Sequence, residues 1–423
     1  MKYKKKIRGG SLQFVLFIGA VIAVLLLTFV LLSYTHLLFS KKTDRFVETI
    51  KRTDLVLQMA LQEESSMERN SQRLPNDGIS TEIDQKFWGV YSLNTVTATF
   101  QKNSFTRVAL TGGRLPGPTT ALFLKDNDRP MVIVGRAKIQ GDAFLPKQGI
   151  RPGNIGGQAF YGNRPIQGRQ RLSSRRLPGI DGEIRSSIAQ LLAEAHQKNI
   201  VQPSLVTTNE IKNSFKEPTL WLDGDVLNLS GKKLIGNIIV RGTQQLVIEP
   251  TTHLQDVILV APQVIIKDGV KGTFQVISSK NISVGKECEL SYPSALVILD
   301  REKNKSAGRN SFGTSPEILI SDHSIVKGVV SYFNEDDKQR YYPQIRIDAD
   351  AQVVGQVHCE KNLELKGRVL GSVTTASFIA MENGNVYQNH LFNGEMDVTQ
   401  VPGEFVGVGY ASNAKQGVAK WLY

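Results

Sequence analysis

The pattern of hydrophobic and polar positions divides the chain into an apolar N-terminal stretch and a long β-rich remainder. Residues 12–32 contain only two polar side chains, Gln13 and Thr28. About 20 apolar residues in an α-helix span the hydrocarbon core of a bilayer. The pattern therefore predicts a cytoplasmic tail and a transmembrane anchor over residues 1–40. A cleavable signal peptide is the competing interpretation, but the sequence SYTHLLFSKK that follows lacks a small-residue cleavage site.

Apolar positions at helical spacing continue beyond the anchor. Phe46, Ile50, Leu57 and Leu61 are separated by charged residues, which indicates an amphipathic, membrane-proximal helix over residues 41–72. Such a helix serves either as a stalk or as a packing helix under the strands that follow.

Short β-branched runs recur at a regular interval within residues 225–392. Two short strands per repeat of about 18–20 residues are typical of a β-solenoid, in which each coil buries its apolar side chains against its neighbours. One set of runs is 238–240, 257–260, 274–277 and 295–299; a second set, out of phase with it, is 246–248, 264–266 and 282–284; later runs are 318–320, 325–330, 345–347, 353–357, 363–365 and 369–373.

A β-sandwich is the competing fold for this region. It would show strict in–out alternation, whereas these runs are dense in Val, Ile and Leu, as strands of parallel sheets are. Hairpin dipeptides are few: Asp268-Gly269 and Asn383-Gly384. The predicted fold class is therefore mainly β, with an N-terminal transmembrane helix, a small antiparallel β region and then a β-solenoid (β-helix). A C-terminal cap or tail is expected over residues 393–423.

Two segments lie between the N-terminal helices and the repeat. Residues 85–140 contain strand-like runs around tight reversals, which predict the small antiparallel region. Residues 141–200 contain a Gly- and Arg-rich loop and then one helix, which Asp181 is placed to cap and which is expected to pack on the sheet.

Six arginines of this loop form the candidate site for an anionic partner: Arg151, Arg164, Arg169, Arg171, Arg175 and Arg176. Such a cluster suits phosphate headgroups, an acidic glycan or an acidic protein. A solvated basic loop without a partner is the plainer interpretation. Because no nucleic-acid motif or aromatic interleaving accompanies the arginines, we expect no nucleic-acid partner.

The charge distribution sets the expected topology. The chain has a formal net charge of +12, and Lys2, Lys4, Lys5, Lys6 and Arg8 crowd the tail before the anchor. Basic residues concentrate on the cytoplasmic side of membrane helices. We therefore expect a single-pass protein with a cytoplasmic N-terminus and the bulk of the chain periplasmic or extracellular. The two cysteines, Cys288 and Cys359, are expected to be buried thiols.

Two short patterns resemble known families. Gly328-Val-Val330, Gly355-Gln-Val357, Gly367-Arg-Val369 and Gly371-Ser-Val373 repeat a Gly-x-Val unit, which resembles bactofilins, the polymer-forming β-helical proteins of bacterial envelopes. The basic leader, Gly9-Gly10 and the long apolar helix resemble type IV pilins, which implies cleavage after Gly10; Val15 stands where such helices carry Glu. The whole arrangement is similar to uncharacterised envelope proteins of the Bacteroidetes type.

Candidate chemistry is sparse. An acid/base or calcium site needs carboxylates on one face, and the candidates are Asp348 with Asp350, Asp336 with Asp337, and Asp322-His323. His358-Cys359 lacks the further ligands that a zinc site needs. The sequence has no G-x-S-x-G, P-loop or dinucleotide fingerprint. We therefore expect no catalytic residue, no metal and no cofactor.

These patterns predict a non-enzymatic, membrane-anchored envelope protein with a structural or assembly role in a surface appendage or in secretion. Its expected partners are the lipid bilayer and envelope proteins or glycans, and a homo-oligomer is left open. The alternatives are a membrane-tethered carbohydrate-active β-helix enzyme and a pilin-like subunit that polymerises through its N-terminal helix.

Overall fold

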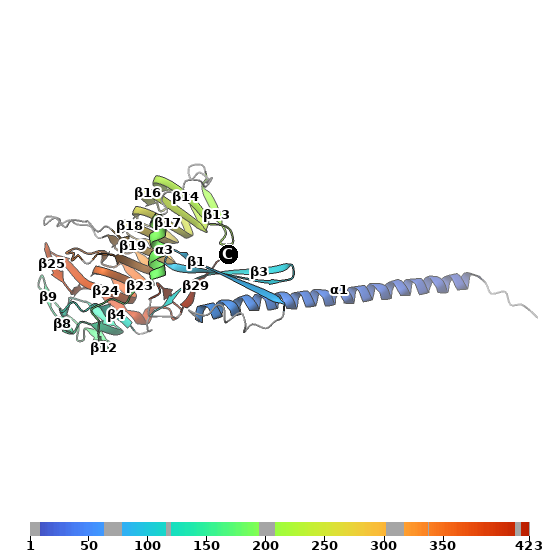
Figure 1. Cartoon of the computed structure of the whole chain (residues 1–423), viewed down its shortest axis with the longest axis horizontal. Coiled ribbons are helices and arrows are strands. Elements are labelled where there is room, and N and C mark those ends of the chain that lie inside the picture. The colour runs from blue at the N-terminus through green and yellow to red at the C-terminus, as the bar shows by residue number, and fades with distance from the viewer. Residues whose placement is uncertain are drawn as a thin grey trace, which may run out of the picture. The chain divides into compact units, whose positions relative to one another are not determined.

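The computed structural model describes residues 9–62, 78–115, 120–193, 208–301, 317–336, 338–410 and 416–422. The protein is mainly β, with one long N-terminal helix, a large parallel sheet and a small antiparallel sheet (Figure 1). The chain forms two compact units. The first comprises Met1–Met59, Glu68–Ile83 and Val96–Thr106, and the second comprises the rest.

Helix α1 (Gly9–Gln62) is the main element of the first unit. Its apolar stretch is exposed along its length, with Leu12, Leu27 and Leu32 65%, 68% and 67% exposed, and it is long and apolar enough to cross a membrane. The helix continues without a break to Gln62; residues 63–72 of the predicted membrane-proximal helix lie outside the described residues. In its second half, Phe46 meets Phe105 edge to face, with 6.0 Å between ring centroids.

The small antiparallel sheet contains β1 (Ile79–Trp88), β2 (Tyr91–Phe100) and β3 (Asn103–Arg114) in that order. Two C-terminal strands, β28 (Val406–Gly407) and β29 (Gln416–Leu422), run antiparallel to β3. The segment predicted as a cap or tail therefore supplies strands to this sheet.

The predicted antiparallel region of 85–140 is antiparallel only in its first part. Strands β4 (Thr120–Leu124) and β5 (Met131–Val134) do not pair with each other. Instead, β4 pairs in parallel with β24 (Arg368–Glu382) and β7 (Asp142–Leu145), and β5 pairs in parallel with β8 (Ile150–Pro152) and β26 (His390–Phe392). The turn-forming residues between β4 and β5 mark a change of direction, but they do not determine which strand each run joins.

The segment predicted as a Gly- and Arg-rich loop, which precedes the helix within residues 141–200, contains short paired strands. It contains β7, β8, β9 (Asn154–Ile155), β10 (Gln158–Ala159), β11 (Ile166–Gln167) and β12 (Gln170–Leu172). Strand β11 pairs in parallel with β6 (Lys138–Gln140), and β12 pairs in parallel with β7. Backbone pairing of these very short strands orders a Gly-rich sequence that has no hydrophobic period.

The predicted helix is present as α3 (Gly182–Ala193). The Asp181 carboxylate accepts a hydrogen bond from the Glu183 backbone N–H at 2.9 Å, as a capping residue does. Ile184 and Ile188 are buried in a hydrophobic cluster that includes Ile258 and Ile277 of the parallel sheet. Both the cap and the packing of this helix are confirmed.

Most of the second unit is a stack of parallel strands (Figure 1). Besides the strands already given, the stack contains β13 (Glu210–Asn213), β14 (Leu220–Leu229), β15 (Lys233–Gly236), β16 (Ile238–Ile248), β17 (His253–Ile266), β18 (Lys271–Val284), β19 (Glu289–Asp300), β20 (Ile318–Ile320), β21 (Ile325–Asn334), β22 (Ile345–Ile347), β23 (Gln352–Leu365) and β27 (Glu395–Asp397). Strand β25 (Asn385–Gln388) pairs antiparallel with β24. The parallel pairings close a ring of six strands, in the order β18-β19-β21-β23-β22-β20 and back to β18.

Three ladders of directly paired residues run through this stack. The first is Leu222, Val240, Leu259, Val276, Leu296, Val330, Val357, Val373, Leu122 and Ala143. The second is Leu227, Leu246, Val264, Ile282, Ile318, Ile345, Leu363 and Phe378. The third is Ile211, Leu234, Leu254, Gly272, Leu290, Val326, Val353, Val369, Met396, Ile139 and Ile166. Almost all of these side chains are buried in one core.

The ladders match the predicted runs in part. The two predicted sets fall in the first and second ladders, whereas the third ladder was not predicted. The run 325–330 belongs to two ladders, because the chain bends at Gly328 (φ 142°) between Val326 and Val330. On the outer side of the first ladder, residues such as Ile239 and Ile258 are buried in the cluster that contains α3, which explains why these runs are apolar on both faces.

Candidate functional site

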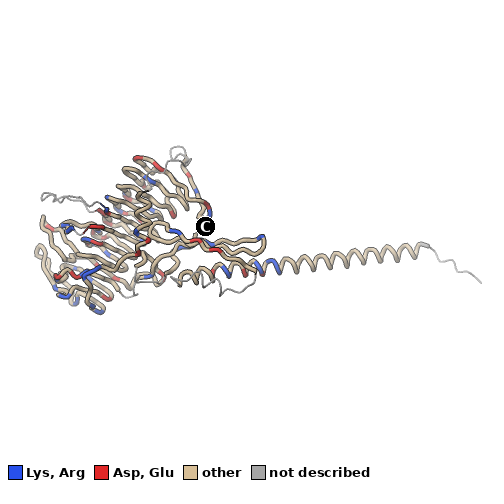
Figure 2. Tube along the Cα trace, viewed as in Figure 1, with Lys and Arg blue, Asp and Glu red and all other residues tan. Residues whose placement is uncertain are grey.

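The six predicted arginines are all exposed, but they do not form one cluster. Arg175 and Arg176 line a cleft, Arg169 and Arg171 converge on one carboxylate, Arg164 lines a second hollow, and Arg151 stands on β8. Residues 120–177 contain eleven Lys and Arg against three Asp. Figure 2 shows Lys and Arg recurring along this segment, so the surface is strongly basic even though its arginines are dispersed.

The cleft beside Arg175 and Arg176 has a volume of about 570 Å³, and we call it the arginine cleft. Its lining contains two acidic side chains, Asp336 and Glu360, and eight basic ones: Lys125, Arg129, Arg175, Arg176, Arg185, Lys338, Arg340 and Lys361. Sequence reasoning identified only two of the eight, because the others come from segments far apart in the chain. The polar loop NEDDKQRYYP, which supplies Lys338 and Arg340, was the one available signal.

One wall of the arginine cleft is fixed by Glu360. Its carboxylate accepts hydrogen bonds from the Arg185 guanidinium and, at 2.7 Å, from the backbone N–H of Asn334. Burial alone would raise the pKa of Glu360, but the hydrogen bonds and charges of His358 and Arg185 lower it to about 2. Glu360 is therefore an ionised anchor for Arg185 and has no proton to donate near neutral pH.

Arg340 lies beneath the cleft in a buried ion-pair network. Its guanidinium contacts Asp300 at 2.7 Å, Glu317 at 2.9 Å and Asp336 at 3.1 Å, and it donates to the Tyr332 hydroxyl at 2.6 Å. Burial and the nearby Glu317 carboxylate raise the pKa of Tyr332. Breaking a buried network of this kind by removing one partner costs about 3–5 kcal/mol, so this cluster has a structural role in shaping the cleft floor.

Arg169 and Arg171 share Asp142. The Asp142 carboxylate lies 3.1 Å from the Arg169 guanidinium and 3.8 Å from that of Arg171. The Arg171 guanidinium also stands 5.6 Å from the centre of the Phe144 ring. Asp142 thus neutralises part of the charge of the predicted cluster. These two arginines therefore have a structural role at the end of the stack.

The described carboxylates of the predicted pairs lie in turns and ion pairs. Asp348 and Asp350 follow β22 in a turn in which Asp350 has a left-handed φ of 58°, so the expected placement on one face of a strand is wrong. Asp348 accepts a hydrogen bond from Arg346 at 2.6 Å. Asp322 faces Lys286 at 3.8 Å, Asp336 belongs to the Arg340 network, and Asp337 lies outside the described residues.

His358 and Cys359 are neighbours in β23 and therefore point to opposite sides of the sheet. Cys359 is in the main core, where burial raises its pKa to about 12. His358 Nδ1 lies 3.3 Å from the Tyr410 hydroxyl, and its Nε2 lies 3.7 Å from Glu360. Cys288 and Cys359 are both buried free thiols, as predicted. Among the residues with described positions, no group of three His, Cys, Asp or Glu could hold a metal ion.

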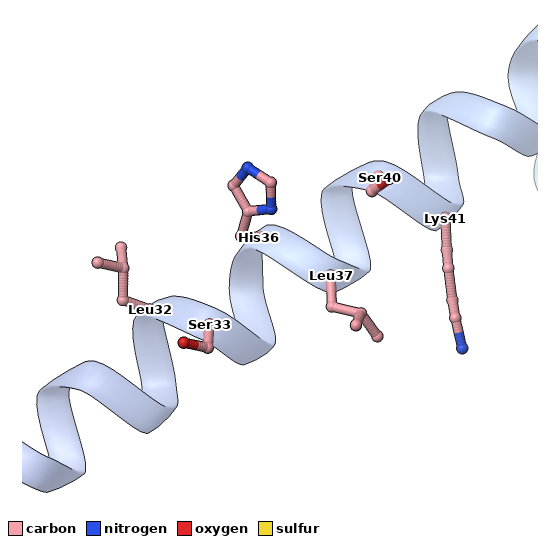
Figure 3. A pocket seen from close by; sticks show the side chains of 6 residues that line it. All are labelled: Leu32, Ser33, His36, Leu37, Ser40 and Lys41. Atoms are coloured by element: carbon pink, nitrogen blue, oxygen red, sulfur yellow. The ribbon is translucent and has the colours of Figure 1, made fainter.

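A further hollow lies along α1. Figure 3 shows the six side chains that line it, which are Leu32, Ser33, His36, Leu37, Ser40 and Lys41. All six belong to this one helix, and His36 and Lys41 point to opposite sides of it (Figure 3). Because side chains of a single exposed helix do not converge on a common point, this hollow is not a candidate site.

Comparison with known proteins gives no relative. No protein-family model, no curated protein and no solved structure matches the chain.

Proposed function

We propose that this chain is a single-pass, non-enzymatic envelope protein in which α1 anchors a β-solenoid to the membrane. The observation that carries the proposal is the exposed apolar surface of α1: Leu12, Phe17, Leu27 and Leu32 are 65% to 68% exposed on a helix that no other described element covers there. A water-exposed apolar surface of this length is costly, and a bilayer would remove it from water.

The three ladders support the solenoid. Between Leu222 and Val276 the first ladder advances by 18, 19 and 17 residues per step, and each step also contributes one residue to the second ladder and one to the third. Three flat faces per turn of chain, each stacked in register, are the geometry of a triangular parallel β-helix. A solenoid buries its core coil by coil, and it presents a rigid side surface that suits a structural or assembly role.

The expected orientation places the basic tail in the cytoplasm and the β domain in the periplasm or outside the cell. This orientation can be measured with single introduced cysteines, because both native thiols are buried. Lys4→Cys reports on the tail, and Leu172→Cys, at a side chain that is 73% exposed, reports on the β domain. In bacterial spheroplasts that produce the protein, a membrane-impermeant maleimide should label the Leu172→Cys variant at once and the Lys4→Cys variant only after permeabilisation.

The unsubstituted protein provides the background of the labelling experiment. Alkaline carbonate should leave the full chain in the membrane pellet, as it does for integral proteins. Release into the supernatant would overturn the anchor, and labelling of the Lys4→Cys variant before permeabilisation would reverse the topology.

A pilin-like subunit is a second candidate, favoured by the uninterrupted course of α1 from Gly9 through the apolar stretch to Gln62. Such a subunit would be processed after Gly10 and would polymerise through this helix. Mass spectrometry of the N-terminus of the protein from native membranes distinguishes the two proposals. A start at Ser11 favours the pilin-like subunit, and a start at Met1 favours the plain anchor.

A further inference from the structure

A hollow of about 670 Å³ lies between the turn that follows β5 and the segment that leads into β11. Its lining contains three basic side chains, two aromatic rings, two amide side chains and no acid: Arg136, Lys138, Arg164, Phe160, Tyr161, Asn163 and Gln167, together with Ala137 and Gly162. We call it the Tyr161 hollow. Its volume is within the range of about 300–1,000 Å³ typical of small-molecule sites.

Backbone hydrogen bonds hold the two walls of the Tyr161 hollow in place. The Tyr161 N–H donates to the Gly135 carbonyl at 3.0 Å, and the Ile139 N–H donates to the Pro165 carbonyl at 3.3 Å. The Arg136 N–H donates to the Asn393 side-chain oxygen at 2.9 Å. Strands β6 and β11 continue this connection by parallel pairing. A ligand would therefore meet a site that is already formed, which lowers the entropic cost of binding.

The positive charge of the Tyr161 hollow is available to a ligand. Within the described part of the chain, neither Arg136 nor Arg164 has a carboxylate within 4 Å. Strand β27 pairs with β6 beside the hollow, and its two acidic side chains have other partners. Glu395 faces Arg368 at 3.3 Å, and Asp397 accepts hydrogen bonds from Thr399 and Gln400. Against the effect of burial, the charge of Lys138 helps to lower the pKa of Asp397. Two unpaired guanidinium groups beside one hollow favour a carboxylate, which each can bind through two parallel N–H groups.

The aromatic lining selects among anionic ligands. The Tyr161 side chain is 67% exposed, although large aromatic residues usually bury most of their surface. A Cβ at Gly162 would lie 2.5 Å from the half-buried Phe160 ring, so this wall has no room for a side chain at Gly162 while the ring keeps its place. An exposed ring can pack on the C–H face of a sugar, and the Asn163 and Gln167 amides can meet its hydroxyl groups.

We propose that the Tyr161 hollow binds an acidic saccharide, with the Tyr161 ring against a sugar face and with Arg136 and Arg164 on its carboxylates. This inference deepens the proposed envelope role by naming the class of partner. It rests on that role only for the location, the cell envelope, in which the protein would meet the glycan. An inorganic phosphate group would use the arginines but not the ring. An acidic protein would need a contact surface of roughly 800 Å² per partner, well beyond one hollow.

The test is calorimetric titration of the full-length protein in detergent micelles with tetragalacturonate. Maltotetraose is the neutral control of equal ring number, and tripolyphosphate is the anion without sugar rings. We expect tetragalacturonate to bind and maltotetraose not to bind. Tyr161→Ala should weaken binding about three- to tenfold, and the double variant Arg136→Gln/Arg164→Gln should weaken it at least about thirtyfold.

The matched control is the double variant Lys147→Gln/Arg151→Gln, which removes the same two charges from exposed positions outside the hollow and should leave affinity within about twofold. The proposal is overturned if tetragalacturonate does not bind, if maltotetraose binds equally well, or if the double variant Arg136→Gln/Arg164→Gln behaves like this control. The Tyr161→Ala variant also separates a sugar site from a simple anion site. If this variant binds both tripolyphosphate and tetragalacturonate as tightly as the unsubstituted protein does, the hollow is a simple anion site instead. Binding to purified protein requires no anchor, so a failure here and a failure of the membrane proposal are separate results.

Discussion

At the scale of single residues, glycine determines where the stack can bend. Gly328, Gly355 and Gly371 pair with one another across three neighbouring strands, and Gly355 has a φ of 140°. A Cβ at Gly355 would lie 2.2 Å from the Gly328 carbonyl oxygen and 2.6 Å from the Phe405 ring. The first of these atoms belongs to the backbone, so it cannot move aside without disturbing the pairing.

We therefore expect Gly355→Ala to lower the free energy of unfolding by about 2–4 kcal/mol. Gly403→Ala is the matched control, because Gly403 is exposed and a Cβ there would meet nothing within 4 Å. Urea unfolding of the full chain, followed by circular dichroism, measures both. Equal midpoints for the two variants would contradict this account of the bend.

The low pKa of Glu360 links stability to pH. Its pKa is about 2 in the folded protein and about 4.3 in an unfolded chain. The folded state therefore binds the proton less readily, so the stabilisation is fully present above about pH 4.3 and is lost as the pH falls towards 2. At pH 3 the loss attributable to Glu360 should be roughly 2 kcal/mol.

Comparing urea unfolding at pH 6 and pH 3 tests this linkage. The protein should lose more stability between these pH values than its Glu360→Gln variant does. Glu404→Gln, at an exposed position, should lose as much as the unsubstituted protein. A Glu360→Gln variant with the same pH dependence as the unsubstituted protein would show that Arg185 and His358 do not hold this carboxylate in its charged form.

At the scale of elements, α3 connects a local signal to tertiary packing. Asp181 caps the helix, and Ile184 and Ile188 are buried on its inner face. Asp181→Ala should cost about 1 kcal/mol, whereas Ser186→Ala, on the exposed face, should change stability by less than about 0.5 kcal/mol. Thermal unfolding monitored by far-UV circular dichroism would compare them, and equal costs would mean that the cap contributes nothing beyond the loss of a polar side chain.

The sequence predicts elements well where one local signal is sufficient. The apolar stretch of α1, the cap of α3 and the runs at 238–240 and 246–248 could all be read from residue spacing. The third ladder could not be predicted in this way. Its residue Val326 and the first-ladder residue Val330 lie in one continuous apolar run, and only Gly328 between them marks the bend. Short strands such as β11 and β12 have no hydrophobic period, so no pattern within residues 141–180 predicted them.

The arginine cleft could not be predicted from the sequence for a different reason. Arg175, Lys338 and Lys361 line the same cleft although they lie in three distant segments. Their proximity depends on which strands stack on which, and that pairing is a property of the fold that residue spacing does not encode. The dense group of arginines in 141–180 indicated a basic surface, but it did not indicate that Arg169 and Arg171 both lie close to the Asp142 carboxylate.

At the scale of the whole molecule, the order of the stack departs from the order of the chain. The first ladder rises from Leu222 to Val373 and then continues with Leu122 and Ala143. Residues 120–172 therefore cover the edge that β24 would otherwise expose. Exposed parallel edges invite association with other chains, so this early segment acts as a cap for the end of the stack.

Hydrogen exchange tests this order directly, because amides paired within the interior of a stack open only with the surrounding structure, whereas those of end strands exchange more readily. Strand β24 is paired on both edges at Val373 and Thr375, whereas β12 is paired only with β7 among the described strands. Peptides from 368–382 should exchange at least about tenfold more slowly than those from 166–172, by mass spectrometry of the full chain. Peptides from 220–229, at the opposite end, should resemble 166–172. If β24 were the terminal strand, as chain order alone suggests, 368–382 would instead exchange as fast as the two ends.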